Sequence, residues 1–244
     1  MKARIAAVGD VHLAEDMRGT YRRHLAGIEE RADVLLLAGD LTRHGTIAEA
    51  EVVVEEFCDL PVPVVAVLGN HDYHSDLEEK ISQMLADAGI TVLDDTSTVI
   101  ECHGETIGVV GGKGFGGGFA GKSASEFGEP EIKAFIRHTR EIAERWRVAL
   151  KELHADHRIV LSHYSPVKDT LEGEPKEIYP FLGSYLLAEA VDAEGADLIV
   201  HGHAHHGTEK GMTSTGIRVR NVALPVLGRA YGVYCLHEPS EVCD

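Results

Sequence analysis

The sequence is short of positive charge. Its 23 Lys and Arg residues stand against 40 Asp and Glu residues, which gives a formal net charge of -17 at pH 7. A protein that binds DNA or RNA along its length needs a basic face to neutralise phosphates, so we expect no extended nucleic acid as a partner. The charge does not exclude a small phosphorylated substrate, because bound cations would dominate the field at a local site.

Cysteines and long apolar runs are also scarce. The four cysteines lack C-x-x-C pairing and the dense spacing of small secreted folds, so we expect reduced thiols. The first apolar run, Ala3–Val8, is interrupted at Asp10 and is too short for a signal-peptide core or a membrane span. We therefore expect a soluble, cytoplasmic protein with no membrane partner. The cysteines are Cys58, Cys102, Cys235 and Cys243.

Apolar runs alternate with segments of helical periodicity in the first half of the chain. This alternation is typical of parallel strands joined by crossover helices, and 44% apolar content allows a sizeable core. Thr46, Ser75 and Ser184 each precede one periodic segment and are candidate N-caps. The predicted helices are Tyr21–Arg31, Ile47–Phe57, Asp76–Ala88, Glu131–Leu153 and Tyr185–Glu194.

Short β-type runs dominate the remaining segments. Thr98–Cys102 and Thr106–Val110 predict a hairpin. After His205, Thr215–Val222 and Gly232–Leu236 have no helix between them and could form or extend a second sheet. No linker rich in Pro, Ser or charge interrupts the chain, and no internal repeat is present, so we predict one domain over residues 1–244.

Five apolar runs end abruptly in residue types that bind metals. In open α/β sheets, ligands bind beyond the carboxyl ends of the strands, so these endings could converge on one polar pocket. Each ending alone has an ordinary explanation as a turn, a helix cap or a surface histidine. Together they would require the same placement to recur by accident. The endings are Gly9-Asp10-Val11-His12, Gly39-Asp40, Gly69-Asn70-His71-Asp72, Ser162-His163 and His201-Gly202-His203-Ala204-His205.

The glycine-rich segment Gly116–Ser123 fits the G-x-x-x-x-G-K-S phosphate-loop pattern. That loop needs a strand feeding straight into it and a helix starting at its lysine. Here the last strand residue, Val110, lies several residues too early, and a glycine and a proline interrupt the expected helix. We favour a mobile loop over the pocket, in which Phe115 or Phe119 could touch substrate, or an exposed flexible turn.

The ordered set Gly-Asp-x-His, Gly-Asp, Gly-Asn-His-Asp, a later His and Gly-His-x-His resembles the calcineurin-like metallophosphoesterases over positions 9 to 205. The resemblance implies an α/β fold of two stacked mixed β-sheets flanked by helices, a four-layer αββα sandwich. It further implies that Asp40 bridges two metal ions. One ion would be held by Asp10, His12, Asp40 and His205, and the other by Asp40, Asn70, His163 and His203.

The chemistry of these donors fits a catalytic centre. Nitrogen and oxygen ligands without thiolate favour two divalent ions, Mn, Fe or Zn, over a structural zinc knuckle. Ions about 3.5–4 Å apart can share a hydroxide, because the pKa of bound water falls from about 15.7 to about 7. Without cations, Asp10 and Asp40 would repel each other, so at least one carboxyl pKa should be raised.

Residues near the ligands have candidate roles of their own. By resemblance, His71 points at the substrate and donates a proton to the leaving oxygen. Asp72 could hold the His71 ring, or it could be an exposed turn carboxylate. Arg43 and His44 could reach substrate, although a solvated loop is the simpler interpretation. Many protein Ser/Thr phosphatases of the superfamily carry Asp-Arg where this chain has Thr42-Arg43, so that subgroup is disfavoured.

We therefore predict a metal-dependent phosphoesterase that attacks a small phosphorylated substrate with a metal-bridging hydroxide, with His71 as general acid. Gly-Asp-x-His-Leu and Gly-Asp-Leu resemble the motifs of small bacterial phosphodiesterases of the superfamily, which slightly favours a diester. The alternatives are a phosphomonoester phosphatase and a catalytically silent metal-binding scaffold. His71 argues against the scaffold, which has no need of an acid. The sequence leaves the oligomeric state open.

Overall fold

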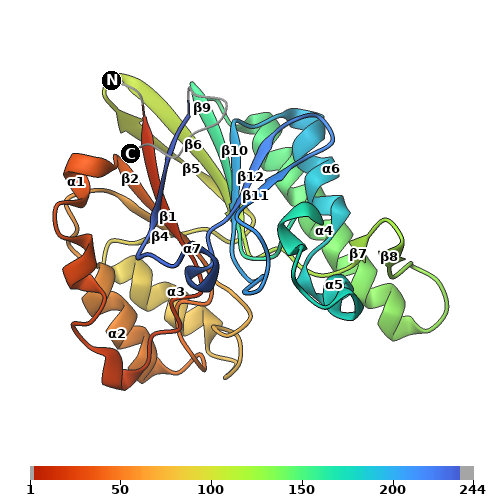
Figure 1. The fold of residues 1–244 in the computed structure, drawn as a ribbon, viewed down its shortest axis with the longest axis horizontal. Helices are drawn as coiled ribbons and strands as arrows, with labels where there is room; N and C mark the ends of the chain where they lie inside the picture. Colours follow the sequence, from red (N-terminus) through yellow and green to blue (C-terminus); the bar gives the residue numbers. More distant parts are fainter. Residues whose placement is uncertain (1–2, 237–244) are drawn as a thin grey trace.

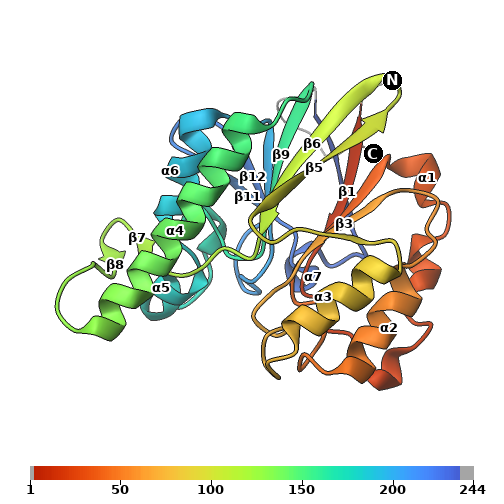
Figure 2. The same cartoon turned by 180° about the vertical axis from the view of Figure 1, so that it is seen from behind.

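Two β-sheets lie face to face with helices on their outer sides (Figure 1, and from behind in Figure 2). The structure is a computed structural model that describes residues 3–236. This arrangement confirms the predicted fold class. The first sheet has the order β13-β1-β2-β3-β4, with β1 to β4 parallel and β13 antiparallel to β1. Its strands are β1 (Arg4–Val8), β2 (Val34–Ala38), β3 (Val64–Val67), β4 (Thr91–Val92) and β13 (Gly232–Cys235).

The second sheet has the order β11-β12-β10-β9-β6-β5, and its four central strands are parallel. The predicted hairpin forms its edge, because β5 pairs antiparallel with β6. A separate two-stranded hairpin joins β7 to β8. These strands are β5 (Thr96–Cys102), β6 (Glu105–Gly112), β7 (Gly118–Phe119), β8 (Lys122–Ser123), β9 (His157–Ser162), β10 (Leu198–His201), β11 (Lys210–Met212) and β12 (Arg218–Asn221).

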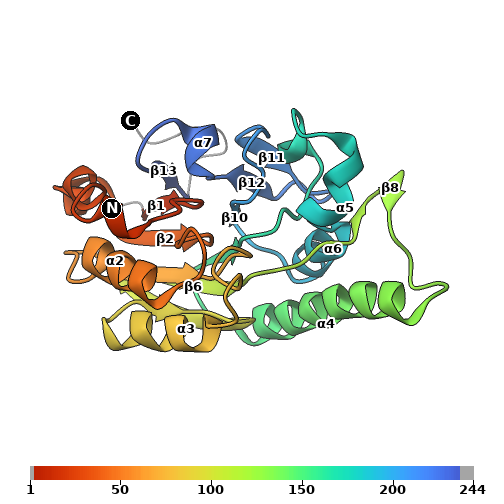
Figure 3. The same ribbon diagram turned by 90° about the horizontal axis from the view of Figure 1, so that it is seen from below.

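Helices bury the outer faces of both sheets. The first three helices pack against the first sheet, and α4 and α6 against the second. Figure 3 shows α4 running out beyond the sheets toward the end of the molecule that carries β8. The helices are α1 (Ile28–Arg31), α2 (Ile47–Phe57), α3 (Glu78–Asp87), α4 (Pro130–Glu152), α5 (Tyr179–Leu182), α6 (Tyr185–Glu194) and α7 (Leu224–Leu227). Among the helices described here, none combines the length and apolar character needed to cross a bilayer.

The central strands are apolar on both faces because each face meets a different layer. In β2, Leu36 packs into the core between the sheets, whereas Leu35 and Leu37 pack against the helices. In β9, Leu161 faces the same central core and Val160 faces α4 and α6. Strands buried on both sides read as continuous apolar runs, which is the pattern in the sequence.

Two helix predictions were wrong in part. The segment Tyr21–Arg31 is not one helix, because Gly27 adopts a left-handed φ of 72° that separates a 3-10 turn from the short α1. Ser75 does not cap α3; its hydroxyl donates to the carbonyl of His44 instead. Thr46 and Ser184 do accept hydrogen bonds from the first turns of α2 and α6, so those two cap predictions are confirmed.

The expectation of reduced thiols also needs a correction. Cys58 and Cys102 are free, as predicted. Cys235, at the end of β13, is in a disulfide. Cys243 lies outside the described residues. Spacing along the sequence was a poor guide here, because absence of a dense cysteine framework does not exclude a single bond.

Candidate metal centre

Loops from both sheets meet at the carboxyl ends of their parallel strands. The loops after β1 and β2 are joined by backbone hydrogen bonds, from Asp10 N to Gly39 O (2.9 Å) and from His12 N to Asp40 O (3.0 Å). In the second sheet, Gly202 N donates to His163 O (3.2 Å), which joins the loops after β9 and β10. Across the sheets, His203 N donates to Asp10 Oδ2 (2.9 Å), so the predicted strand-end residues of both sheets come to one place.

The first group of donors contains Asp10, His12, Asp40 and His205, whose ligand atoms all lie within 4.8 Å of one another. His205 Nε2 is 2.8 Å from Asp10 Oδ1, and His12 Nε2 is 3.8 Å from Asp40 Oδ2. His12 Nε2 is buried without a hydrogen-bond partner among the described residues. A buried nitrogen that faces carboxylates and lacks a partner is an available ligand atom.

The second group contains Asp40, His163 and His203, again within 4.8 Å. His163 Nε2 lies 3.4 Å from Asp40 Oδ1 and 2.9 Å from Asn70 Oδ1, which places the amide oxygen of Asn70 in this group. Asp40 therefore belongs to both groups. The structure brings together all seven residues that the sequence singled out as metal ligands.

Backbone carbonyls fix the orientation of two of the imidazoles. His163 Nδ1 donates to Ala38 O (2.9 Å), so Nε2 faces Asp40. His203 Nε2 donates to Phe181 O (3.2 Å), which leaves Nδ1 as the ring nitrogen available to a metal. Metal-binding histidines in proteins almost always donate their second ring nitrogen in this way, so both rings have the orientation that a metal requires.

The backbone at the centre is unusually constrained. Asp10, His12, Asp40 and His203 have φ angles of 56°, 43°, 50° and 70°, in the left-handed region that few residues other than glycine adopt. Such conformations cost on the order of 1–3 kcal/mol each and cluster at functional sites. Four of the predicted ligands share this left-handed backbone, so the loops accept local backbone strain at the positions that direct these side chains toward one another.

Two glycines let the loops approach the carboxylates. A Cβ on Gly69 would collide with Asp40 Oδ1, and a Cβ on Gly202 would collide with Asp10 Oδ2. Each glycine directly precedes a predicted ligand, Asn70 or His203. The Gly-Asn and Gly-His pairs in the sequence thus have a steric reason as well as a chemical one.

Electrostatics at the centre favour bound cations. Burial, reinforced by the charge of Asp40, raises the pKa of Asp10 to about 6 in spite of a hydrogen bond from His205. Burial lowers the pKa of His203 to about 3 and that of His163 well below its ordinary value, so both rings are neutral and able to bind a metal. Within residues 3–236, no Lys or Arg forms an ion pair with Asp10 or Asp40. Divalent ions fit this donor set.

His71 lies beside the two groups with its ring partly exposed. Its Nδ1 donates to Arg43 O (2.7 Å), and its Nε2 is 4.0 Å from Asp40 Oδ2. Its backbone N also donates to Asp40 Oδ1 (2.8 Å). The Arg43 carbonyl fixes the ring, and sequence reasoning missed it because a backbone atom leaves no signal in residue type.

Neither role considered for Asp72 is correct. Its carboxylate is completely buried and accepts hydrogen bonds from Gly69 N (2.7 Å), Leu41 N (3.2 Å), Thr42 N (2.8 Å) and Thr42 Oγ1 (2.6 Å). None of these donors belongs to the His71 ring. Asp72 ties the loop after β2 to the loop after β3 and so sets the relative positions of the groups on them.

The side chains of Arg43 and His44 point away from the centre. The Arg43 guanidinium contacts Met17 Sδ (3.6 Å), and His44 Nδ1 contacts Glu49 Oε1 (3.1 Å) at the start of α2. These contacts agree with the expected solvated loop. The contribution of this segment to the site is a main-chain carbonyl, not a charged side chain.

The glycine-rich segment does not have the geometry of a phosphate loop. It forms the β7–β8 hairpin, Lys122 is exposed on β8, and no helix begins until Pro130. The segment is not an exposed turn throughout either, since Phe119 is buried. Phe115 lies with its ring centroid 5.7 Å from that of Tyr164, which follows the predicted ligand His163 in sequence. Contact of Phe115 or Phe119 with substrate stays a prediction.

Comparison with known proteins places this arrangement in a family. The family model for calcineurin-like phosphoesterases matches residues 3–207. No curated protein matches the chain in sequence. The matching solved structures include the phosphopantetheinyl hydrolase of Mycobacterium tuberculosis, with 14% identity, a TM-score of 0.63, and coverage of 91% of this chain and 89% of that one.

Two further structures are similar in fold. The protein TT1561 of Thermus thermophilus has 15% identity and a TM-score of 0.61, with 98% of this chain and 97% of that one covered. The NAD nucleotidase of Haemophilus influenzae has 15% identity and a TM-score of 0.51, with 96% of this chain but 46% of that one covered. The family match, the fold and the two donor groups agree with one another, and the chain belongs to the calcineurin-like phosphoesterases, a family of metal-dependent hydrolases.

Proposed function

We propose that this protein hydrolyses small phosphate esters at a centre of two divalent ions, with phosphodiesters slightly favoured over monoesters. The supporting observation is that one buried carboxylate, Asp40, is shared by two groups of nitrogen and oxygen donors. Asp10, His12, Asp40 and His205 would hold one ion, and Asp40, Asn70, His163 and His203 the other. Mn, Fe and Zn all suit such ligands.

Two divalent ions, when bound, would lower the pKa of water and offset the negative charge that develops on the phosphoryl group. The residues of the chain prepare that site in advance. The carbonyls of Ala38 and Phe181 hold two imidazoles in place, and Asp72 holds the loops that carry Asp40 and Asn70. Preorganised groups of this kind need little rearrangement during the reaction, which is a major source of catalysis.

His71 supplies the general acid. Because its Nδ1 proton is donated to Arg43 O, its Nε2 is the nitrogen that faces the donor groups. A proton on Nε2 can pass to the leaving oxygen of an ester bound there. General acid catalysis contributes about 10²–10⁴-fold in rate. The preference for a diester rests on the Gly-Asp-x-His-Leu and Gly-Asp-Leu motifs.

A panel of two substrates tests the proposal. Purified protein is depleted of metal, reconstituted separately with Mn²⁺, Fe²⁺ or Zn²⁺, and assayed with bis(4-nitrophenyl) phosphate and 4-nitrophenyl phosphate. We expect metal-dependent release of nitrophenol from both, with the higher kcat/KM on the diester. A higher kcat/KM on the monoester would reverse the preference, and no release with any of the three metals would contradict the proposed activity.

A further inference from the structure

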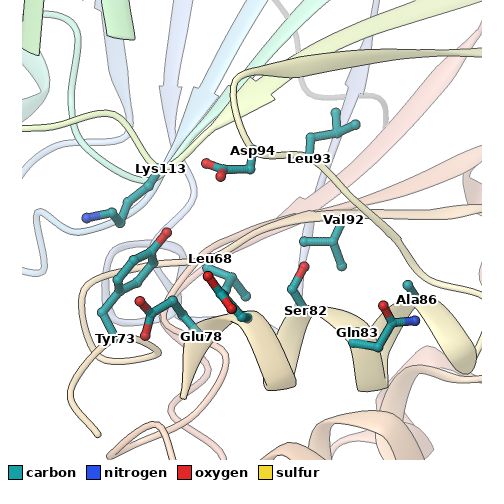
Figure 4. Close-up of a pocket in the computed structure, with 11 residues that line it drawn as sticks. Leu68, Tyr73, Glu78, Ser82, Gln83, Ala86, Val92, Leu93, Asp94 and Lys113 are labelled. Carbon is teal, nitrogen blue, oxygen red and sulfur yellow. The ribbon is translucent and has the colours of Figure 1, made fainter. Parts of the chain in front are cut away.

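A cavity of about 320 Å³ lies beside the metal centre, at the carboxyl end of β3. Figure 4 shows residues of α3 along one side, Val92 and Leu93 on another, and Lys113 close to Tyr73 at one end. Its volume is within the range of small-molecule sites. The lining residues are Leu68, Tyr73, Glu78, Glu79, Ser82, Gln83, Ala86, Val92, Leu93, Asp94 and Lys113.

Lys113 connects this cavity to the metal centre. It follows β6, and its carbonyl accepts hydrogen bonds from His163 N (3.1 Å) and Tyr164 N (3.0 Å). Its ammonium lies 4.1 Å from the centroid of the Tyr73 ring in the cavity wall and 5.9 Å from that of Tyr164. The Tyr164 ring in turn lies 4.4 Å from the His203 ring. The ammonium therefore stands between the cavity and the imidazoles.

The charge of Lys113 is not matched by a direct partner. Among the described residues, no carboxylate oxygen lies within 4.0 Å of its Nζ, and no hydrogen bond to Nζ is formed. Three aromatic rings surround it, those of Tyr73, Phe115 and Tyr164. Burial lowers the pKa of Lys113, against the opposing effect of more distant carboxylates. A partly desolvated cation of this kind is stabilised by an anionic ligand.

A second group in the cavity is also unmatched. Glu78 Oε2 is buried without a hydrogen-bond partner within residues 3–236. It is an acceptor that a ligand hydroxyl can satisfy. The side chains of Leu68 and Val92 add apolar surface. The other charged side chains of the lining, Glu79 and Asp94, are also carboxylates, so Lys113 is the one position in the lining where a ligand anion meets a cation. The cavity thus offers a cation at one end, carboxylate acceptors for hydroxyls along its walls and apolar surface between, which complements an organic group with several hydroxyls and one negative charge placed at Lys113.

We propose that this cavity binds the organic part of the phosphate ester, and that Lys113 determines specificity by binding a second anionic group on it. This inference rests on the proposed phosphoesterase function. The preferred substrates are organic phosphate esters that carry hydroxyl groups and a further negative charge in addition to the phosphoryl group at the metals.

Binding is measured first, by calorimetry on the Mn²⁺-loaded full chain. The probes are uridine 3′,5′-bisphosphate and uridine 5′-monophosphate, which differ by the 3′-phosphate and both keep the 2′-hydroxyl. We expect the bisphosphate to bind roughly 10- to 100-fold more tightly, the range for a hydrogen bond to a charged group. Lys113→Met should remove this difference, and Lys113→Arg should retain most of it. Lys122→Met is the matched control, because Lys122 is exposed on β8, and it should change nothing.

Hydrolysis is measured second, on the 4-nitrophenyl esters of the same two nucleotides, with bis(4-nitrophenyl) phosphate as a substrate that lacks a second anion. Lys113→Met should lower kcat/KM by roughly 10- to 100-fold on the ester with the 3′-phosphate and much less on the other two substrates. An equal loss on all three substrates would mean that Lys113 supports the fold or the metal centre, and would overturn the subsite.

The two measurements separate this inference from the proposed function. Lys113-dependent preference for the bisphosphate in a protein that hydrolyses none of the esters would leave the subsite standing and contradict the phosphoesterase activity. Active protein that binds both nucleotides equally, or whose preference survives Lys113→Met, would overturn the subsite and leave the activity standing.

Discussion

Two places in the described part of the chain bring a carboxylate within ligand distance of an imidazole, and they lie at opposite ends of the strands. At the carboxyl ends, Asp40 is shared by the two groups of the candidate metal centre. At the other end, Asp33 just before β2 lies near Cys102, the last residue of β5, and His103 in the turn that follows, with ligand atoms again within 4.8 Å. By residue type alone, both places qualify as metal sites.

The partners of the carboxylates separate the two places. Asp33 forms an ion pair with Arg4 (2.9 Å). Burial raises the pKa of the Asp33 carboxyl, but hydrogen bonds from Arg4 and His103 lower it further, so this pKa lies below its ordinary value. Asp10 lacks a Lys or Arg partner within residues 3–236, and burial raises its pKa to about 6. A carboxylate whose charge the chain already balances has little need of a cation. Uncompensated charge, rather than donor type, distinguishes the candidate metal centre from this second cluster.

The sharpest test of this comparison replaces the two aspartates in turn. Asp40→Asn weakens the hold on both ions, so we expect a larger loss of kcat than the about 10²–10⁴-fold that general acid catalysis contributes. Asp33→Asn should leave the rate unchanged. Hydrolysis of bis(4-nitrophenyl) phosphate measures both. An active Asp40→Asn protein would remove the basis of the two-metal proposal.

The histidines provide the next test. His71→Ala should slow an ester with a poor leaving group, such as an alkyl phosphate, by about 10²–10⁴-fold. Esters of 4-nitrophenol should lose far less, because that leaving group needs no proton. His103→Ala is the control at the other cluster and should affect neither substrate. Equal losses on both substrates with His71→Ala would exclude its role as acid.

Removal of metal should destabilise the protein. An ion present at 100 times its dissociation constant stabilises the fold by about 2.7 kcal/mol per site. For a chain of this length we expect a fall in Tm of about 5–10 °C per site on chelation, at about 2–4 °C per kcal/mol. Cys102→Ser should show the same chelation-dependent shift as the wild type. A Tm that does not respond to chelation would argue against structural coupling of the ions.

The smallest expected effect is on the pH dependence of metal binding. Since the pKa of Asp10 is raised to about 6, this carboxyl is protonated below pH 6 in the metal-free protein, and an ion must displace its proton. Affinity should therefore fall by at least about tenfold for each pH unit below 6, because His205, whose pKa is raised by its hydrogen bond with Asp10, is a second group that must lose a proton to bind the ion. His203, with a pKa of about 3, adds nothing in this range. Calorimetric Mn²⁺ titrations at pH 7, 6 and 5 measure the slope, and equal affinity at all three would contradict it.

The sequence indicated the fold and the seven candidate ligands because strand-end motifs and apolar periodicity are local signals. It failed where backbone atoms or distant segments decide the outcome. Gly27 breaks a segment whose helical periodicity runs on past it, and Asp72 takes three of its four hydrogen-bond donors from Leu41 and Thr42, about 30 positions away. The cavity at Lys113 needs α3, the loop after β4 and the end of β6 together. The single domain over residues 1–244 and the cytoplasmic location stay predictions.

Each donor group takes members from both sheets. Asp10 and His12 follow β1 of the first sheet, whereas His205 follows β10 of the second; Asn70 follows β3, whereas His163 follows β9. An ion bound by either set would thus be a further cross-link between layers that apolar contacts and hydrogen bonds, such as that from His163 Nδ1 to Ala38 O, already hold together. Sliding or separation of the two sheets would pull these donors apart, so bound ions would oppose opening of the sandwich, and opening of the sandwich would release them.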